Sequence, residues 1–314
     1  MIRTWGSAAW RDLWCTFHPM RALAPLLFLL STLAVAQDPV FVYHTPRTQY
    51  LFPEEADPAY VLFTDAPVHA EPAMDAPVLL KATAGEVVQV LEATEDTLVL
   101  NGLMSHWYRV ALRNVEGWTW GGNLAQRTFG SHGDPTVKFV AGIDHVTPSD
   151  TGRYDFSYRI VAVRNGHELD RIVVRSFAWG FEEVRDHGHL GLRNVDDVIT
   201  LAVPCVGGCG CTTGEVVVFW SGGRFHHVAD LMGTPDGDFS ENVGFVYPAD
   251  MEGEANTIVR VTGTYEEPEE EEQSDEPSNS LSRILRKEYL RWDGAALIPS
   301  GRAMEERRYE MTLD

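Results

Sequence analysis

Three cysteines lie close together in a glycine-rich segment, a grouping that could form a disulfide or hold a metal ion. They are Cys205, Cys209 and Cys211. In an oxidising compartment a disulfide is the expected chemistry, and we predict that one pair among the three forms it. Cys205 bonded to Cys209 or to Cys211 is favoured, because a bond between Cys209 and Cys211 would close a strained ring. The odd number of thiols leaves one unpaired.

Histidines are the ligands that a zinc site would add to these thiolates, since zinc takes sulfur and imidazole nitrogen in a tetrahedron. Two pairs are available, His187 with His189 and His226 with His227. Their spacing from the cysteines matches no zinc motif, so we expect no metal ion and no cofactor. The alternative function is a metal-dependent or thiol-dependent envelope enzyme that uses the cysteine cluster and these histidines.

Carboxylates alternate with other residues after Asp230, as they do in a calcium loop. The segment holds Asp236, Asp238 and Glu241, but it lacks the EF-hand spacing and the closing bidentate glutamate, and Asp236-Gly237 is the sequence of an ordinary turn. The chain also has no Gly-x-Ser-x-Gly, no His-Glu-x-x-His and no glycine-rich phosphate loop. We therefore expect no catalytic residues; a hydrolase whose Asp and His residues converge only in space is the alternative.

Aromatic side chains are the candidates for binding a ligand by stacking. Trp107 and Trp118 are expected to pack in the core, and Trp120 is the better surface candidate. Because Trp118 and Trp120 are two residues apart, they face the same side of one strand. With Tyr108 they would line a groove able to stack on sugars or peptide side chains. We predict Tyr108, Trp118 and Trp120 as the ligand-binding residues.

Short strands must position these aromatic residues. Four runs between Tyr60 and Leu124 are rich in β-branched and aromatic residues at strand length. They are Val78–Leu80, Val87–Leu91, Trp107–Leu112 and Gly117–Trp120. Short strands at this spacing predict a small barrel.

The order of these runs resembles that of the bacterial SH3-like (SH3b) domain. The resemblance rests on Ala76-Pro77-Val78, on Ala84-Gly85-Glu86 before a Val-rich strand, on His106-Trp107-Tyr108-Arg109-Val110, and on Glu116-Gly117-Trp118-Thr119-Trp120 before Asn123-Leu124. It implies an SH3-like barrel over residues 57–127 and, as ligand, peptidoglycan peptide or another envelope component. Two departures affect any ligand groove: residues 94–105 lengthen the loop before Trp107, and Val68–Pro72 replaces the usual opening.

The rest of the chain, residues 136–314, is predicted as a larger antiparallel β-sandwich or open-barrel domain, which makes the fold all-β. Asn165-Gly166 between apolar runs is a strong hairpin signal, and Ser221-Gly222-Gly223 joins a second hairpin. Gly130–Pro135 is expected to be a linker. Further strands are predicted at Asp197–Val203, Val243–Tyr247, Thr257–Tyr265, Tyr289–Trp292 and Ala295–Ile298.

The front of the chain has the three parts of a secretory signal peptide. A basic start at Met20-Arg21 precedes an apolar run and the small-x-small site Ala34-Val35-Ala36. We expect residues 1–36 to be an upstream extension plus signal, with translation starting at Met20, and residues 37–56 to be a lead-in segment. The mature protein would be exported to the periplasm or the medium without a transmembrane segment, since the apolar run is too short to span a bilayer.

Charge excludes one class of partner. The 25 basic and 46 acidic residues give a net charge of −21, which repels a phosphate backbone, so we expect no nucleic acid partner. Eight of the eleven residues in 266–276 are acidic; such a block cannot bury apolar surface and is expected to be a solvated loop. Together these features predict a non-catalytic binding or scaffolding protein of the bacterial envelope.

Overall fold

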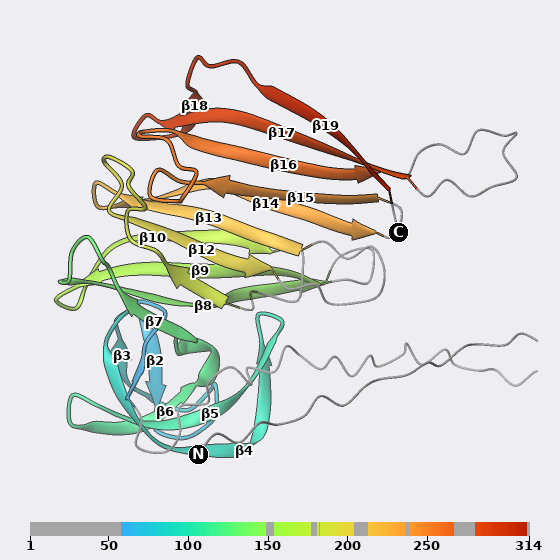
Figure 1. The fold of residues 1–314 in the computed structure, drawn as a ribbon. Helices are drawn as coiled ribbons and strands as arrows, with labels where there is room; N and C mark the ends of the chain where they lie inside the picture. The colour runs from blue at the N-terminus through green and yellow to red at the C-terminus, as the bar shows by residue number, and fades with distance from the viewer. Residues whose placement is uncertain are drawn as a thin grey trace, which may run out of the picture. The chain divides into compact units, whose positions relative to one another are not determined.

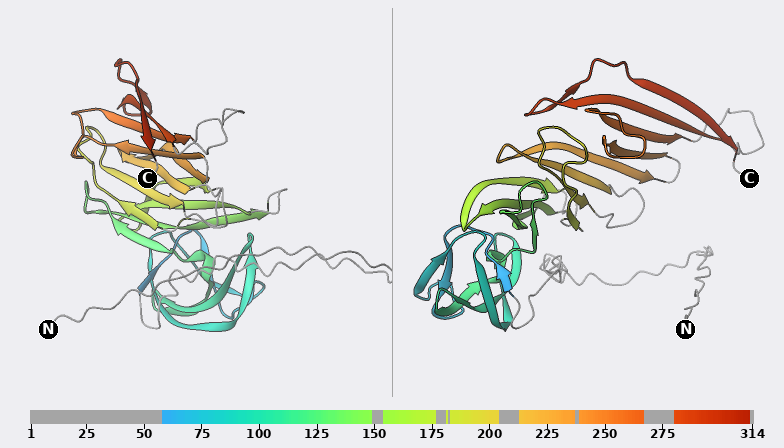
Figure 2. Two further views of the ribbon diagram at one scale, coloured as in Figure 1. Left: turned by 45° about the vertical axis from the view of Figure 1, so that its right-hand side comes forward. Right: turned by 60° about the vertical axis from the view of Figure 1, so that its left-hand side comes forward.

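The computed structural model describes residues 58–148, 154–176, 181, 183–203, 213–236, 239–266 and 280–312. Their strands form three antiparallel sheets, and the one helix among them is the short 3-10 helix η1, Gly121–Asn123 (Figures 1 and 2). The all-β fold class is thereby confirmed. The predicted signal peptide, the lead-in segment, the three clustered cysteines and residues 267–276 of the acidic loop lie outside the described residues.

The first sheet has six strands that curl into a half-barrel, in the order β1-β4-β5-β6-β2-β3. Its interior is apolar because alternate residues of each strand point inward, including Val88, Val90, Tyr108 and Val110. The strands are β1 Pro58–Tyr60, β2 Ala66–His69, β3 Val78–Ala82, β4 Val87–Leu100, β5 Leu103–Leu112 and β6 Val115–Trp120.

The segment expected to be a lengthened loop, residues 94–105, is instead the end of a long β-hairpin. Strands β4 and β5 stay paired as far as Leu100 and Leu103, with register shifts that interrupt the pairing near Ala93. The two turn residues, Asn101 and Gly102, have φ angles of 52° and 74°, as a two-residue hairpin turn requires. The prediction of a loop was wrong because Asn101-Gly102 is a two-residue turn sequence, which lets the flanking residues pair as strands.

The second sheet has the order β10-β9-β8-β7, and its central strands β8 and β9 are buried on both faces. Phe139 and Ile160 belong to one core cluster, and Val140 and Val161, their neighbours in sequence, belong to another. The predicted turn at Asn165-Gly166 is confirmed, with φ angles of 51° and 76°. The strands are β7 Arg127–Gly130, β8 Val137–Pro148, β9 Tyr154–Arg164 and β10 His167–Ser176.

The third sheet has nine strands, in the order β11 to β18 with β19 paired to β17. The run Asp197–Val203 is a strand, as predicted, and Gly222 and Gly223 form the expected turn with positive φ. Its strands are β11 Glu183–Asp186, β12 Asp197–Val203, β13 Thr213–Ser221, β14 Arg224–Asp236, β15 Phe239–Val246, β16 Ile258–Glu266, β17 Ser280–Trp292, β18 Leu297–Pro299 and β19 Glu305–Thr312.

Strands β12 and β13 are the centre of the larger core. Residues from β8 and β9 pack against one face of them, where the ring centroids of Phe139 and Trp220 lie 5.6 Å apart. Phe219, the neighbour of Trp220, belongs to the core on the opposite face with Tyr247 and Ile258. Burial on both faces explains why these strands are almost continuously apolar in sequence.

Backbone contacts join the half-barrel to the second sheet. The amide of Gln126 donates to the carbonyl of Ala141 at 2.8 Å, and the amide of Val146 donates to the carbonyl of Asn101, in the turn of the long hairpin, at 2.9 Å. Leu62 and Ala84 pack with Val140 in one apolar cluster. The first two sheets are therefore in direct contact along the barrel side of β8.

Candidate functional site

Tyr108, the first predicted ligand-binding residue, lies inside the half-barrel. Its side chain is 3% exposed and packs in the barrel core, which includes Val88 and Val110. Burial raises the pKa of the Tyr108 hydroxyl far above its usual value. The ring is therefore part of the barrel core, and little of its surface is accessible to a ligand.

Trp120 is also buried, so the expectation that it lies at the surface was wrong. It is 5% exposed, and its indole Nε1 donates a hydrogen bond to the backbone carbonyl of Leu98 at 3.1 Å. The long hairpin formed by β4 and β5 therefore contacts the Trp120 ring. Trp107, opposite it on β5, is 5% exposed, as a core residue should be.

Trp118 is the one residue of the predicted set that keeps a partly exposed side chain. It packs at the edge of the larger core, which Leu98 and Leu100 of the hairpin also contact. The three predicted aromatic residues therefore do not line an open groove together: Tyr108 faces the barrel interior, whereas Trp118 and Trp120 pack with the opposite core. Their role in binding a ligand stays a prediction.

A different part of the half-barrel exposes apolar side chains. Met74, Val78 and Leu79 are 52%, 49% and 47% exposed. They lie on the β2–β3 connection and on β3, which is an edge strand of its sheet. We call these three residues the β3 strip. Single exposed apolar residues are ordinary, but these three lie within six residues of one another, which makes the β3 strip a candidate interaction surface.

Hydrogen bonds hold the connection between β2 and β3, which contains Met74 of the strip. The imidazole of buried His69 is bonded through Nδ1 to the carbonyl of Ala76 at 2.9 Å, and the amide of Ala70 donates to the carbonyl of Pro77 at 2.9 Å. The Leu79 side chain lies over Gly117 of β6: a Cβ added to Gly117 would be 3.0 Å from Leu79 Cδ1. The strip therefore has a defined conformation before any ligand binds.

The family model of the bacterial SH3 domain matches residues 64–125. Residues 64–125 are a bacterial SH3 domain. This SH3 domain contains β2 to β6 and the β3 strip, and it contains all three aromatic residues predicted to bind a ligand. Comparison of the chain with curated proteins and with solved structures gives no match. Among the described residues, no helix has the length and apolar character needed to cross a membrane.

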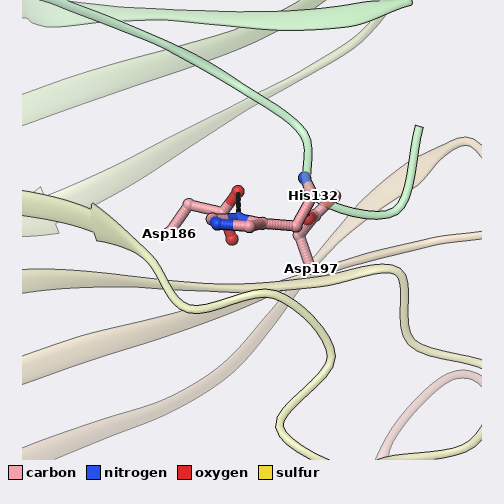
Figure 3. Close-up of side chains that lie close together, drawn as sticks. All are labelled: His132, Asp186 and Asp197. Atoms are coloured by element: carbon pink, nitrogen blue, oxygen red, sulfur yellow. Dashed lines mark hydrogen bonds and ion pairs between the residues drawn. The ribbon is translucent and has the colours of Figure 1, made fainter. Parts of the chain in front are cut away.

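A second candidate site lies in the larger domain, where His132, Asp186 and Asp197 converge (Figure 3). Asp197 begins β12 and is fully buried; its carboxylate accepts hydrogen bonds from the amides of His132 and Gly133 at 2.7 and 3.2 Å and from the Ser131 hydroxyl. These bonds hold the β7–β8 loop against the third sheet. The segment predicted as a linker is therefore the attachment point between two sheets.

Asp186 ends β11 beside this loop. Its side chain is 3% exposed, and its carboxylate accepts a hydrogen bond from the amide of Gly188 and is bonded to His132 Nδ1, both at 2.8 Å. The hydrogen bond to Asp186 raises the pKa of His132. Burial raises the pKa of Asp186, and the charge of Asp197 raises it further. One ligand atom from each of the three side chains lies within 4.8 Å of the others.

No local pattern in the sequence predicts this cluster, because its members are far apart in the chain: Asp186 and Asp197 meet through the pairing of β11 with β12, and His132 reaches them from the β7–β8 loop. The four histidines proposed as zinc ligands lie elsewhere or point differently. His187 Nε2 is 2.8 Å from the Thr200 hydroxyl, the His226 ring packs on Trp292, and His227 pairs with Asp230 at 2.7 Å. Within the described part of the chain, none of them belongs to a group of three metal-ligating side chains.

His189 and the carboxylate-rich segment after Asp230 have local roles. The amide of Gly191 donates to His189 Nδ1 at 2.8 Å. Asp236 ends β14 and pairs with Phe239 of β15, so the strands around the carboxylate-rich segment form a hairpin. Cys205, Cys209 and Cys211 lie outside the described residues, and their predicted disulfide stays a prediction.

Proposed function

We propose that this chain is a non-catalytic binding protein of the bacterial envelope, and that its SH3 domain binds a peptide of peptidoglycan through the β3 strip. The observation that carries the proposal is the exposed apolar strip on an edge strand of a bacterial SH3 domain. Bacterial SH3 domains often bind the cell wall and are typical of envelope proteins. The signal-like sequence at Met20–Ala36 supports export.

The edge position of β3 suits an extended peptide. One side of β3 is hydrogen-bonded to β2, and the other side leaves backbone groups that an added strand can pair with. Val78 and Leu79 would contact the apolar side chains of the peptide. Lys81, exposed on the same strand, offers a positive charge to its carboxylates.

Cosedimentation with purified peptidoglycan tests the proposal. We expect the wild-type protein to be retained and Leu79→Glu to bind about tenfold more weakly, which corresponds to a loss of about 1.4 kcal/mol. Val173→Glu is the matched control, since Val173 is also an exposed apolar strand residue, at 43%, but belongs to β10. Equal retention of the two variants would contradict the assignment to the β3 strip.

Trp118→Ala separates this surface from the aromatic residues predicted first. We expect this variant to be retained as the wild type is, because the Trp118 side chain packs against the larger core. A loss of binding in Trp118→Ala with normal binding in Leu79→Glu would return the site to the aromatic set.

The absence of catalysis and the export of the chain need separate measurements. Incubation of the protein with dye-labelled peptidoglycan should release no soluble fragments; time-dependent release would establish a hydrolase. Sequencing the N-terminus of protein isolated from its native host should find Gln37 first. A chain that still begins at Met1 or Met20 would contradict removal of the signal.

A further inference from the structure

We propose that His132, Asp186 and Asp197 form a binding site for one Zn²⁺ ion, which joins the β7–β8 loop to strands β11 and β12. This site is separate from the SH3 domain and does not depend on the function proposed for it. The three residues come from the loop after β7, from the end of β11 and from the start of β12 (Figure 3).

Distances between the candidate ligand atoms fit one ion. His132 Nδ1 and Asp186 Oδ2 are 2.8 Å apart, and one carboxylate oxygen of Asp197 completes a group whose members all lie within 4.8 Å. Two ligands of a tetrahedral zinc ion, each about 2.0–2.1 Å from the metal, are about 3.3 Å apart. To hold an ion, His132 Nδ1 and Asp186 Oδ2 would therefore have to move apart, and any pair near the 4.8 Å limit would have to move closer.

Charge supplies an independent reason for a cation. Two carboxylates, one with 3% side-chain exposure and one fully buried, lie beside each other here. Among the described residues no lysine or arginine forms an ion pair with Asp186 or Asp197, and the basic group bonded to Asp186 is His132, whose side chain is 63% exposed. Buried charges are normally paired with opposite charge or bound to metal. A divalent cation would neutralise both carboxylates.

The kinds of ligand select zinc over the common hard cations. Calcium and magnesium prefer sites made of oxygen atoms, whereas zinc accepts imidazole nitrogen together with carboxylate oxygen. Both carboxylates are already oriented by backbone amides, Asp186 by Gly188 and Asp197 by His132 and Gly133. His132 would bind through Nδ1 as the neutral imidazole, with its proton released to solvent. Its exposure leaves a path for the ion to enter.

Titration of the full-length, metal-free protein with ZnCl₂ in a calorimeter tests the site. Every sample carries the same three background substitutions, Cys205→Ser, Cys209→Ser and Cys211→Ser. Zinc bound by thiolates then does not contribute to the measured heat. We expect one zinc per chain, and at least a tenfold loss of affinity in His132→Gln. Asp186→Asn should also weaken zinc binding, because a neutral amide is a poor zinc ligand. The substitution keeps the size of the side chain.

His145→Gln is the matched control. His145 also bonds an aspartate through Nδ1, at 2.9 Å from its neighbour Asp144, and has 47% side-chain exposure. Its loss should leave zinc affinity unchanged, and circular dichroism should show that all variants fold. Zinc binding that is equal in His132→Gln and wild type would overturn the proposal, as would no binding at micromolar zinc or equal affinity for Ca²⁺. Those outcomes would leave the cluster as a hydrogen-bonded attachment alone.

Discussion

The indole Nε1 of Trp120 donates a hydrogen bond to the backbone carbonyl of Leu98 at 3.1 Å. This bond joins β6 to the long β4–β5 hairpin, which is where the chain departs from the SH3-like pattern in sequence. Tryptophan usually finds a partner for its N–H when it is buried, and the hairpin provides one. The same lengthening that changes the pattern therefore covers the ring that was expected at the surface.

Replacing Trp120 or Trp118 by alanine should lower the free energy of unfolding by different amounts, because Trp120 is buried and Trp118 is half-buried. Trp120→Ala should lower the free energy of unfolding by about 3–5 kcal/mol, the usual loss for a large ring removed from a core. Trp118→Ala removes a partly exposed ring and should cost less, about 1–2 kcal/mol. Urea denaturation followed by circular dichroism measures both. Equal and small losses would mean that the hairpin does not cover Trp120.

Two glycines with nearly equal backbone angles test whether the hairpin turn contacts β8. Gly102 and Gly166 have φ angles of 74° and 76°, so alanine meets similar backbone strain at each. A Cβ at Gly102 would lie 2.1 Å from the carbonyl oxygen of Val146, whereas one at Gly166 has nothing within 4 Å. Gly166→Ala should cost about 1 kcal/mol, and Gly102→Ala about 3 kcal/mol.

Thermal unfolding of the two glycine variants in parallel measures this difference. If both melt at the same temperature, the contact between the hairpin turn and Val146 does not exist in solution. If Gly166→Ala is the less stable of the two, the steric contact at Gly102 does not determine the difference, because a methyl group at Gly166 meets only open space.

Turns and central strands were the parts of the fold that could be predicted. Asn165-Gly166 required a tight turn, and the apolar run Asp197–Val203 could be buried only as a strand between others. Strand β19, by contrast, was missed because its residues are mostly charged and exposed. It exists through its pairing with β17 and through ion pairs such as Arg286 with Glu306, at 2.7 Å. Pairing with a distant strand leaves no local pattern.

The site was harder to predict than the fold, for a related reason. Two-residue periodicity correctly placed Trp118 and Trp120 on one side of β6, but it could not say that the second sheet and the hairpin cover that side. His132 lies in a Ser-His-Gly-Asp segment that has the composition of a linker. Its partners are 54 and 65 residues later in the chain, in β11 and β12. Only the topology of the sheets brings these groups together.

The hydrogen bonds to Asp197 predict a large loss of stability when that carboxylate is removed. Asp197→Ala would leave three donors of the β7–β8 loop without their acceptor, at a site where the carboxylate is fully buried. We expect the free energy of unfolding to fall by about 3 kcal/mol. Asp196→Ala is the control, because Asp196 is exposed and should change stability by less than about 0.5 kcal/mol.

Denaturation by urea in metal-free buffer compares the two aspartate variants. Similar midpoints would show that the loop is not held by Asp197. Because the buffer contains no zinc, a loss of stability in Asp197→Ala comes from the missing hydrogen bonds. This prediction therefore stands whether or not the cluster binds an ion.

Glu215 on β13 should make stability depend on pH. It is half-buried beside Ala202 and Leu231 on the neighbouring strands, and burial raises its pKa, while nearby His187 lowers it in part. A carboxyl group with a raised pKa binds its proton more tightly in the folded state than in the unfolded state. Stability from this group is therefore present below the unfolded pKa of about 4.3 and is lost as pH rises through the folded pKa.

Replacing Glu215 by glutamine should remove this loss. Near pH 4 the wild type and Glu215→Gln should melt at similar temperatures, and near pH 7 the variant should melt at the higher temperature, because the folded wild type then holds a half-buried carboxylate. Glu116→Gln, at an exposed position on β6, controls for the loss of one negative charge from an acidic protein. The difference between the two variants isolates the effect of burial, because both remove the same charge. A variant Glu215→Gln that melts below wild type near pH 7 would mean that the carboxylate is stabilised by a favourable interaction that outweighs its desolvation.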